Sequence, residues 1–234
     1  MLLKDVTFRN LLYTLIIVKS KKDAEYQEKL FKIDSIDINN FEEEFDSITI
    51  ENEVNAMLLF PYLDYTQGLS FLLVASGLIE DNTITFYERP NFDTFQILKK
   101  DNLNDKEVFY LNELLINNDF DLEFYAKYAI NQTENYRNDA EVEMLRAFSE
   151  IDSCRNEDFP DDFLAFFFKE GLNPEGMWVR GKELKKDHIL AELLNQPSQD
   201  FGINAGDMVK VVVYEDDLGE ISCIAELRWI YVRS

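Results

Sequence analysis

Residues 176–213 constrain the fold most, because short apolar segments alternate there with turn residues at regular intervals. The block reads GMWVRGKELKKDHILAELLNQPSQDFGINAGDMVKVVV. Its pattern predicts three strands, joined by the LKKD turn and then by a polar loop, over 177–184, 188–195 and 208–215. Gly202 and Gly206 in the polar loop can adopt positive φ, and Asp207 can accept bonds from nearby backbone N–H groups. The block therefore predicts a small antiparallel β module.

The flanking residues extend this module on both sides. FLAFFFKEG (163–171) predicts a strand, and NPEG (173–176) is turn chemistry that joins it to the next strand as a hairpin. Before it, 140–151 has Val142, Leu145 and Phe148 at helical spacing. After it, DDLG (216–219) predicts a turn into a last strand. We expect a strongly bent antiparallel sheet or partial barrel that packs on the 140–151 helix.

The N-terminal part predicts a mixture of elements. Apolar runs predict strands over 11–20 and 83–90. The runs 48–50 and 54–60 fit strands ended by Pro61, although the MLL stretch of the second run would also suit a helix. Helical spacing predicts helices over 21–33, 105–116 and 121–130, whereas 69–79 fits either a buried helix or a central strand. The polar segment 131–140 is the best candidate for an exposed link. We expect an α+β protein, with an N-terminal mixed region over 1–135 and the β module with its leading helix over 136–234.

The C-terminal motifs resemble a known family. Met177-Trp178-Val179, then Leu193-x-Asn195-x-Pro197, then Gly206-Asp207 opening a strand is similar to the YegJ-type family of bacterial domains of unknown function. The resemblance covers about residues 140–215. It departs just before the Met-Trp pair, where Glu175 and Gly176 replace the polar, His-type residue often found there. The resemblance implies a fold and brings no chemistry with it.

The chain is strongly acidic: 23 Lys and Arg stand against 46 Asp and Glu, a net charge of −23. Such a surface repels nucleic acid and anionic lipid, so we expect neither as a partner. The acidity serves either solubility alone or a basic protein partner. In the second case the acids should crowd on one face, and the candidates are Glu157, Asp158, Asp161, Asp162, Glu215, Asp216 and Asp217.

The loop 195–207 supplies the other candidate residues, which are Trp178, Asn195, Asp200, Phe201 and Asp207. One interpretation is structural: Trp178 is a core ring, Asn195 caps a strand end and Asp207 caps a turn. The functional interpretation is a binding cleft between Trp178 and the loop, with Asp200 and Phe201 at its lip. We expect Trp178 to be largely buried.

No catalytic pattern stands out. Cys154, Cys223 and the only histidine, His188, lack metal-ligand spacing, and the eight glycines form no phosphate-binding loop. We therefore expect no metal and no cofactor. The apolar run 11–18 is too short to span a bilayer, and no signal peptide is evident, so we expect a cytoplasmic protein. The expected function is non-enzymatic binding or regulation, for example inhibition of a basic toxin. The alternative is a hydrolase that uses a carboxylate pair in a cleft of the C-terminal module.

Overall fold

The computed structural model describes residues 1–19, 54–87, 96–117 and 119–231. The chain forms two compact units: residues 1–62 with 70–132, and residues 63–69 with 133–234. The sequence pattern did not predict that residues 63–69 belong to the second unit. Both units combine helices with sheets, so the predicted α+β class is confirmed. No helix within the described ranges is long and apolar enough to cross a membrane.

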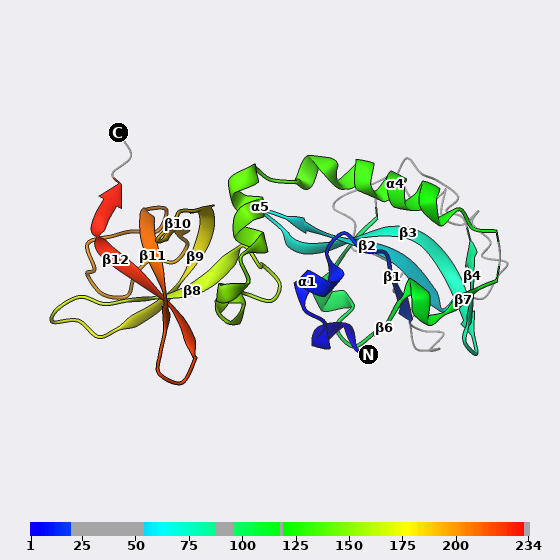
Figure 1. The fold of residues 1–234 in the computed structure, drawn as a ribbon, viewed down its shortest axis with the longest axis horizontal. Coiled ribbons are helices and arrows are strands. Elements are labelled where there is room, and N and C mark those ends of the chain that lie inside the picture. Colours follow the sequence, from blue (N-terminus) through cyan, green and yellow to red (C-terminus); the bar gives the residue numbers. More distant parts are fainter. Residues whose placement is uncertain (20–53, 88–95, 118, 232–234) are drawn as a thin grey trace, which may run out of the picture. The chain divides into compact units, whose positions relative to one another are not determined.

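The first unit is built on a seven-stranded sheet (Figure 1). Its strand order is β6-β1-β2-β3-β4-β7, and β5 also pairs with β3. The strands are β1 (Ile16–Lys19), β2 (Ala56–Asp64), β3 (Gly68–Glu80), β4 (Thr83–Tyr87), β5 (Ile97–Lys99), β6 (Glu107–Tyr110) and β7 (Leu115–Ile116). The short helices are η1 (Leu3–Asp5), α1 (Phe8–Leu11), η2 (Lys100–Asn102) and η3 (Leu111–Glu113).

The central strands of this sheet are covered on both faces. Nearly every residue of β2 and β3 is buried, as expected where both faces of a strand meet apolar neighbours. Helix α4 (Leu122–Thr133) lies along one face, where its Tyr125 and Ala129 join the core (Figure 1). The helix predicted over 121–130 is thus confirmed, and it runs on to Thr133. The ambiguous segment 69–79 is a central strand.

The helix predicted over 105–116 is wrong. Residues 107–110 form β6, whose Val108 lies opposite Val18 of β1 in an antiparallel pair. A 3-10 turn and the short β7 follow, with Leu115 opposite Thr83. The helical spacing of Val108, Leu111, Leu114 and Leu115 exists in the sequence, but pairing with an available sheet edge overrides it.

Several other expectations for the first unit are corrected in detail. β2 does not end at Pro61 but continues to Asp64. Proline is tolerated there because β1 pairs with β2 only as far as Leu59, so β1 needs no backbone N–H from residue 61. The Pro61 carbonyl still accepts a hydrogen bond from Tyr13 N at 3.0 Å. The strand predicted over 11–20 begins only at Ile16, after α1 and a positive φ of 58° at Tyr13. β4 confirms the strand predicted from residue 83. The predicted helix 21–33 and strand 48–50 lie outside the described residues.

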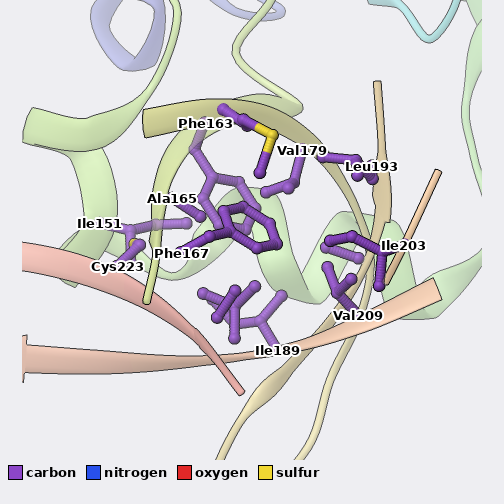
Figure 2. Packing of buried hydrophobic residues seen from close by; sticks show 14 of the residues in the cluster. Ile151, Phe163, Ala165, Phe167, Val179, Ile189, Leu193, Ile203, Val209 and Cys223 are labelled. Atoms are coloured by element: carbon purple, nitrogen blue, oxygen red, sulfur yellow. The ribbon is translucent and has the colours of Figure 1, made fainter. Parts of the chain in front are cut away.

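The second unit is a closed five-stranded barrel (Figure 1). The strands are β8 (Asp162–Phe167), β9 (Glu175–Leu184), β10 (Ile189–Leu193), β11 (Met208–Glu215) and β12 (Ile221–Tyr231). Consecutive strands pair antiparallel, and β12 closes the barrel by pairing parallel with β8. The predicted bent sheet or partial barrel is confirmed, and the closure is complete. Its interior is filled by side chains that include Phe163, Phe167, Val179, Val209 and Cys223 (Figure 2).

A helix packs on the barrel, as the sequence predicted. α5 (Ala140–Ala147) is followed by a 3-10 segment, η5 (Ser149–Cys154), so the helix is shorter than the predicted 140–151. A Cβ at Gly181 of β9 would lie 2.0 Å from Leu145 Cδ2. Glycine at this position therefore allows the close approach of α5 to the sheet. The 3-10 segment η4 (Glu134–Tyr136) precedes α5.

Candidate functional site

Strand alternation places one set of side chains on the outside of the barrel. In β8 the buried apolar residues are Phe163, Ala165 and Phe167, so Leu164 and Phe166 point outward. The register sets Trp178 beside Leu164, and Ile224 beside both Phe166 and Val212. Tyr214 lies opposite Ser222 in the next row. We call the resulting set the apolar outer face; it consists of Leu164, Phe166, Trp178, Val212, Tyr214 and Ile224.

The apolar outer face is accessible to solvent. Tyr214 is 53% exposed and Phe166 is 37% exposed, while the other four side chains are half-buried. Phe168, immediately after β8, is also exposed. The face crosses four neighbouring strands, β9, β8, β12 and β11, and a contiguous apolar surface of this kind is typical of an interaction site.

The turn between β11 and β12 is next to this face. Asp216 Oδ1 accepts from the backbone N–H groups of Leu218 (2.8 Å) and Glu220 (2.9 Å), which holds the turn in one shape. Leu218 at its tip is 88% exposed. Glu215 and Asp217 are also exposed. The turn thus presents an apolar side chain between carboxylates, whereas Asp216 itself has a structural role.

The other predicted acidic residues, Glu157 to Asp162, lie at the same end of the barrel, but they do not form an exposed cluster. The parallel pair Cys223↔Ala165 places the start of β12 beside the start of β8, so residues 157–162 and the 216–219 turn share an end. However, Asp161 and Asp162 are buried. Asp161 accepts two bonds from Arg146, at 2.8 and 2.6 Å, and Asp162 accepts two from Arg180, at 2.6 and 2.9 Å.

The prediction that Asp161 and Asp162 contribute to an acidic face is therefore wrong, because their charges are neutralised inside the structure. The turn between β9 and β10, also at this end, carries Lys185 and Lys186. Of the same acidic residues, Glu157 stays exposed and Asp158 is half-buried, so the exposed negative charge of this end lies on Glu157 and, in the β11–β12 turn, on Glu215, Asp217 and Glu220.

The residues predicted around the loop 195–207 hold that loop in place. Asn195 Oδ1 accepts from Trp178 N at 2.8 Å, and Asp207 Oδ2 accepts from Asn204 N at 2.7 Å. Asp200 Oδ1 accepts from Gly202 N at 3.1 Å, and Lys169 Nζ donates to the Asp200 carbonyl at 2.6 Å. These contacts agree with the structural interpretation of Asn195 and Asp207. The two loop glycines have the positive φ that the sequence predicted, 82° and 90°.

Two expectations about aromatic residues are wrong. Phe201 does not lie at the lip of a cleft: it is 3% exposed and contacts Phe167 edge-on in the barrel core, with ring centroids 6.3 Å apart. Trp178 is only half-buried, because Met177 and Val179 fill the interior positions of β9 and alternation sends Trp178 outward. The backbone of Trp178 is therefore bonded to the loop residue Asn195, whereas its side chain belongs to the apolar outer face.

Carboxyl groups elsewhere in the unit show lowered pKa values. Hydrogen bonds from the backbone N–H and the hydroxyl of Ser198 lower the pKa of Glu175, and the hydrogen bond with His188 lowers the pKa of Asp187. A general acid at neutral pH needs the opposite shift. Across the described ranges, no three His, Cys, Asp or Glu side chains converge in a way that could hold a metal ion.

The sequence interpretation missed five members of the apolar outer face and the exposed Leu218. These five, Leu164, Phe166, Val212, Tyr214 and Ile224, belong to strands that were predicted, but their outward direction was not considered. The available signal was strand alternation, which places Leu164 and Phe166 on one face of β8 and Phe163 and Phe167 on the other.

Comparison with known protein families, with curated proteins and with solved structures finds no match to this chain. The candidate site therefore rests on geometry and chemistry alone.

Proposed function

We propose that this protein is a non-enzymatic, cytoplasmic binding protein, and that its barrel unit docks a basic protein partner. The observation that carries the proposal is the apolar outer face, bordered by the carboxylates of the β11–β12 turn. An immunity-type inhibitor of a basic toxin is one concrete form of this function.

The composition of the face fits a protein interface. Its aromatic members are Phe166, Trp178 and Tyr214, and aromatic side chains are enriched at interface centres and among the residues that dominate binding energy. Its aliphatic members continue the same rows of the sheet: Leu164 lies beside Trp178, and Ile224 lies between Phe166 and Val212. The bonded β11–β12 turn holds Leu218 out as a preformed apolar contact, so little ordering free energy is lost on binding.

Charge supports the class of partner. Glu215, Asp217 and Glu220 border the apolar contact, and the whole chain carries −23. Rim carboxylates attract a positively charged surface from a distance and raise the association rate more than the final affinity. A basic protein with an exposed apolar patch matches both properties.

The alternative, a hydrolase with a carboxylate pair, gains less support. The adjacent Asp161 and Asp162 are each held by an arginine, and Asp216 is occupied by backbone donors. The resemblance to the YegJ-type family remains part of the proposal for residues 140–215, and two cysteines without a disulfide framework fit a cytoplasmic location.

The test is affinity capture with four versions of the full chain, the unaltered one and three double variants. The binding kinetics of each captured protein are then measured after its purification. Phe166→Ser with Leu218→Ser should weaken binding about 10- to 100-fold through faster dissociation, since it removes two apolar contacts. Glu215→Gln with Asp217→Asn should mainly slow association, and should flatten its dependence on salt.

The matched control is Glu80→Gln with Asp81→Asn, which removes the same charge from an exposed turn of the first unit, between β3 and β4. It should bind like the unaltered chain. If no basic protein distinguishes the barrel variants from this control, the proposed function is wrong.

A further inference from the structure

The two cysteines of the chain meet in the barrel unit. Cys154 ends η5, and Cys223 lies on β12 with its side chain in the barrel core, beside Ile151 of η5 (Figure 2). Cys154 packs against the same core, with its Sγ 3.6 Å from the carbonyl oxygen of Ile221. The thiol of Cys223 is hydrogen-bonded to the sulfur of Cys154. Residues far apart in the sequence thus place two free thiols next to each other, one in the barrel core and one packed against it.

The two thiols differ in reactivity. Cys154 is half-buried, and the hydrogen bond from Cys223, with smaller contributions from Ser153 and the positive charge of Arg155, lowers its pKa to about 6. Cys223 is 0% exposed, and the same hydrogen bond together with burial raises its pKa. Of the two thiols, Cys154 is therefore the one that ionises first, and Cys223 is the protonated partner. A reachable thiolate next to a second thiol is the arrangement typical of redox-sensitive cysteines.

We propose that Cys154 and Cys223 form a redox modification site, which a peroxide converts into an intramolecular disulfide. The Cys154 thiolate attacks one peroxide oxygen, the O–O bond breaks, and Cys154 becomes a sulfenic acid while hydroxide leaves. The Cys223 sulfur then attacks the Cys154 sulfur, the S–O bond breaks, and water leaves with the Cys223 proton. The two sulfurs lose two electrons in total, and the peroxide takes them up.

This inference goes beyond the proposed binding function and does not depend on it. The disulfide would join η5 to β12 and enclose residues 155–222, which contain β8 to β11. Ile224, the residue after Cys223, belongs to the apolar outer face, so the link would also restrain the strand behind that face.

The test treats the reduced full chain with hydrogen peroxide, alkylates it under denaturing conditions and maps the peptides by mass spectrometry. We expect both cysteines to be lost to alkylation and one cross-linked 154–223 peptide to appear, all within single chains, with recovery after dithiothreitol. Alkylation of Cys154 in the untreated protein should rise with pH and reach half its maximum near pH 6. The barrel of the oxidised chain should unfold at a higher urea concentration.

Two variants separate the steps. Cys223→Ala should leave Cys154 as a sulfenic acid that dimedone traps, and Cys154→Ser should leave Cys223 unreacted because it is buried. The proposal is overturned if peroxide takes Cys154 to the sulfinic acid in the unaltered chain, if disulfides form only between chains, or if both thiols stay reduced. Since these three outcomes are measured on the unaltered chain, the test still decides the matter when a variant fails to fold.

Discussion

The buried pair between Arg146 of α5 and Asp161 before β8 offers a sharp test of what holds the barrel unit together. The side chains are only 4% and 7% exposed, and the guanidinium bonds both carboxylate oxygens. Arg146 also donates to Glu143 at 2.6 Å. Arg146→Met keeps much of the aliphatic volume but leaves the Asp161 carboxylate without its guanidinium partner.

Breaking a buried ion pair on one side costs about 3–5 kcal/mol, because the remaining charge has lost its solvent and its partner. With a urea m-value of about 2 kcal/mol/M for a domain of this size, the unfolding midpoint should fall by roughly 1.5–2.5 M. Fluorescence is a suitable readout, since both tryptophans of the chain, Trp178 and Trp229, belong to the barrel unit.

Two further variants test whether burial is the cause of this cost. Lys185→Met breaks an ion pair with Glu183 whose members are 45% and 32% exposed, and it should cost less than about 1 kcal/mol. Arg146→Met with Asp161→Leu removes both buried charges and should recover most of the loss. Burial is not the cause if Arg146→Met shifts the midpoint no further than Lys185→Met does, or if the double variant is as unstable as the single one.

The other stability predictions use the same urea assay. Phe167→Ala empties a 0% exposed core position and should cost about 3–5 kcal/mol, whereas Phe166→Ala, its outward-facing neighbour, should cost about 1 kcal/mol or less; similar losses would contradict the assignment of inner and outer faces. Gly206→Ala should cost about 1–2 kcal/mol from backbone strain alone, because φ is 90° and nothing lies within 4 Å of the added Cβ. Gly206→Asn should cost less than Gly206→Ala, since asparagine tolerates this region better, and the reverse order would show that strain is not the cause.

The sequence by itself determined the elements whose signals are local. Turn residues and alternation placed the strands β8 to β11, and Gly202 and Gly206 marked the turns that need positive φ. Helical spacing located α4 and α5. These features depend on neighbouring residues along the chain, so a single sequence is enough to predict them.

Only the tertiary structure decided features that depend on partners far apart in the sequence. Val108 lies in a strand and not in a helix because β1 offers an edge to pair with. Asp161 is buried and neutralised because α5 brings Arg146 against it, although its acidic neighbours predicted an exposed cluster. The proximity of Cys154 to Cys223 likewise follows from the packing of η5 on β12.

The candidate site illustrates the same division. In FLAFFFK, every other residue turns outward, but the sequence does not say which set does so until a core exists to bury the other. The parallel pairing of β12 with β8 then places Ile224 beside Phe166 and completes the face. Charge and aromatic content were visible in the sequence, whereas their gathering on one surface required the barrel to close, because closure alone fixes which strands are neighbours.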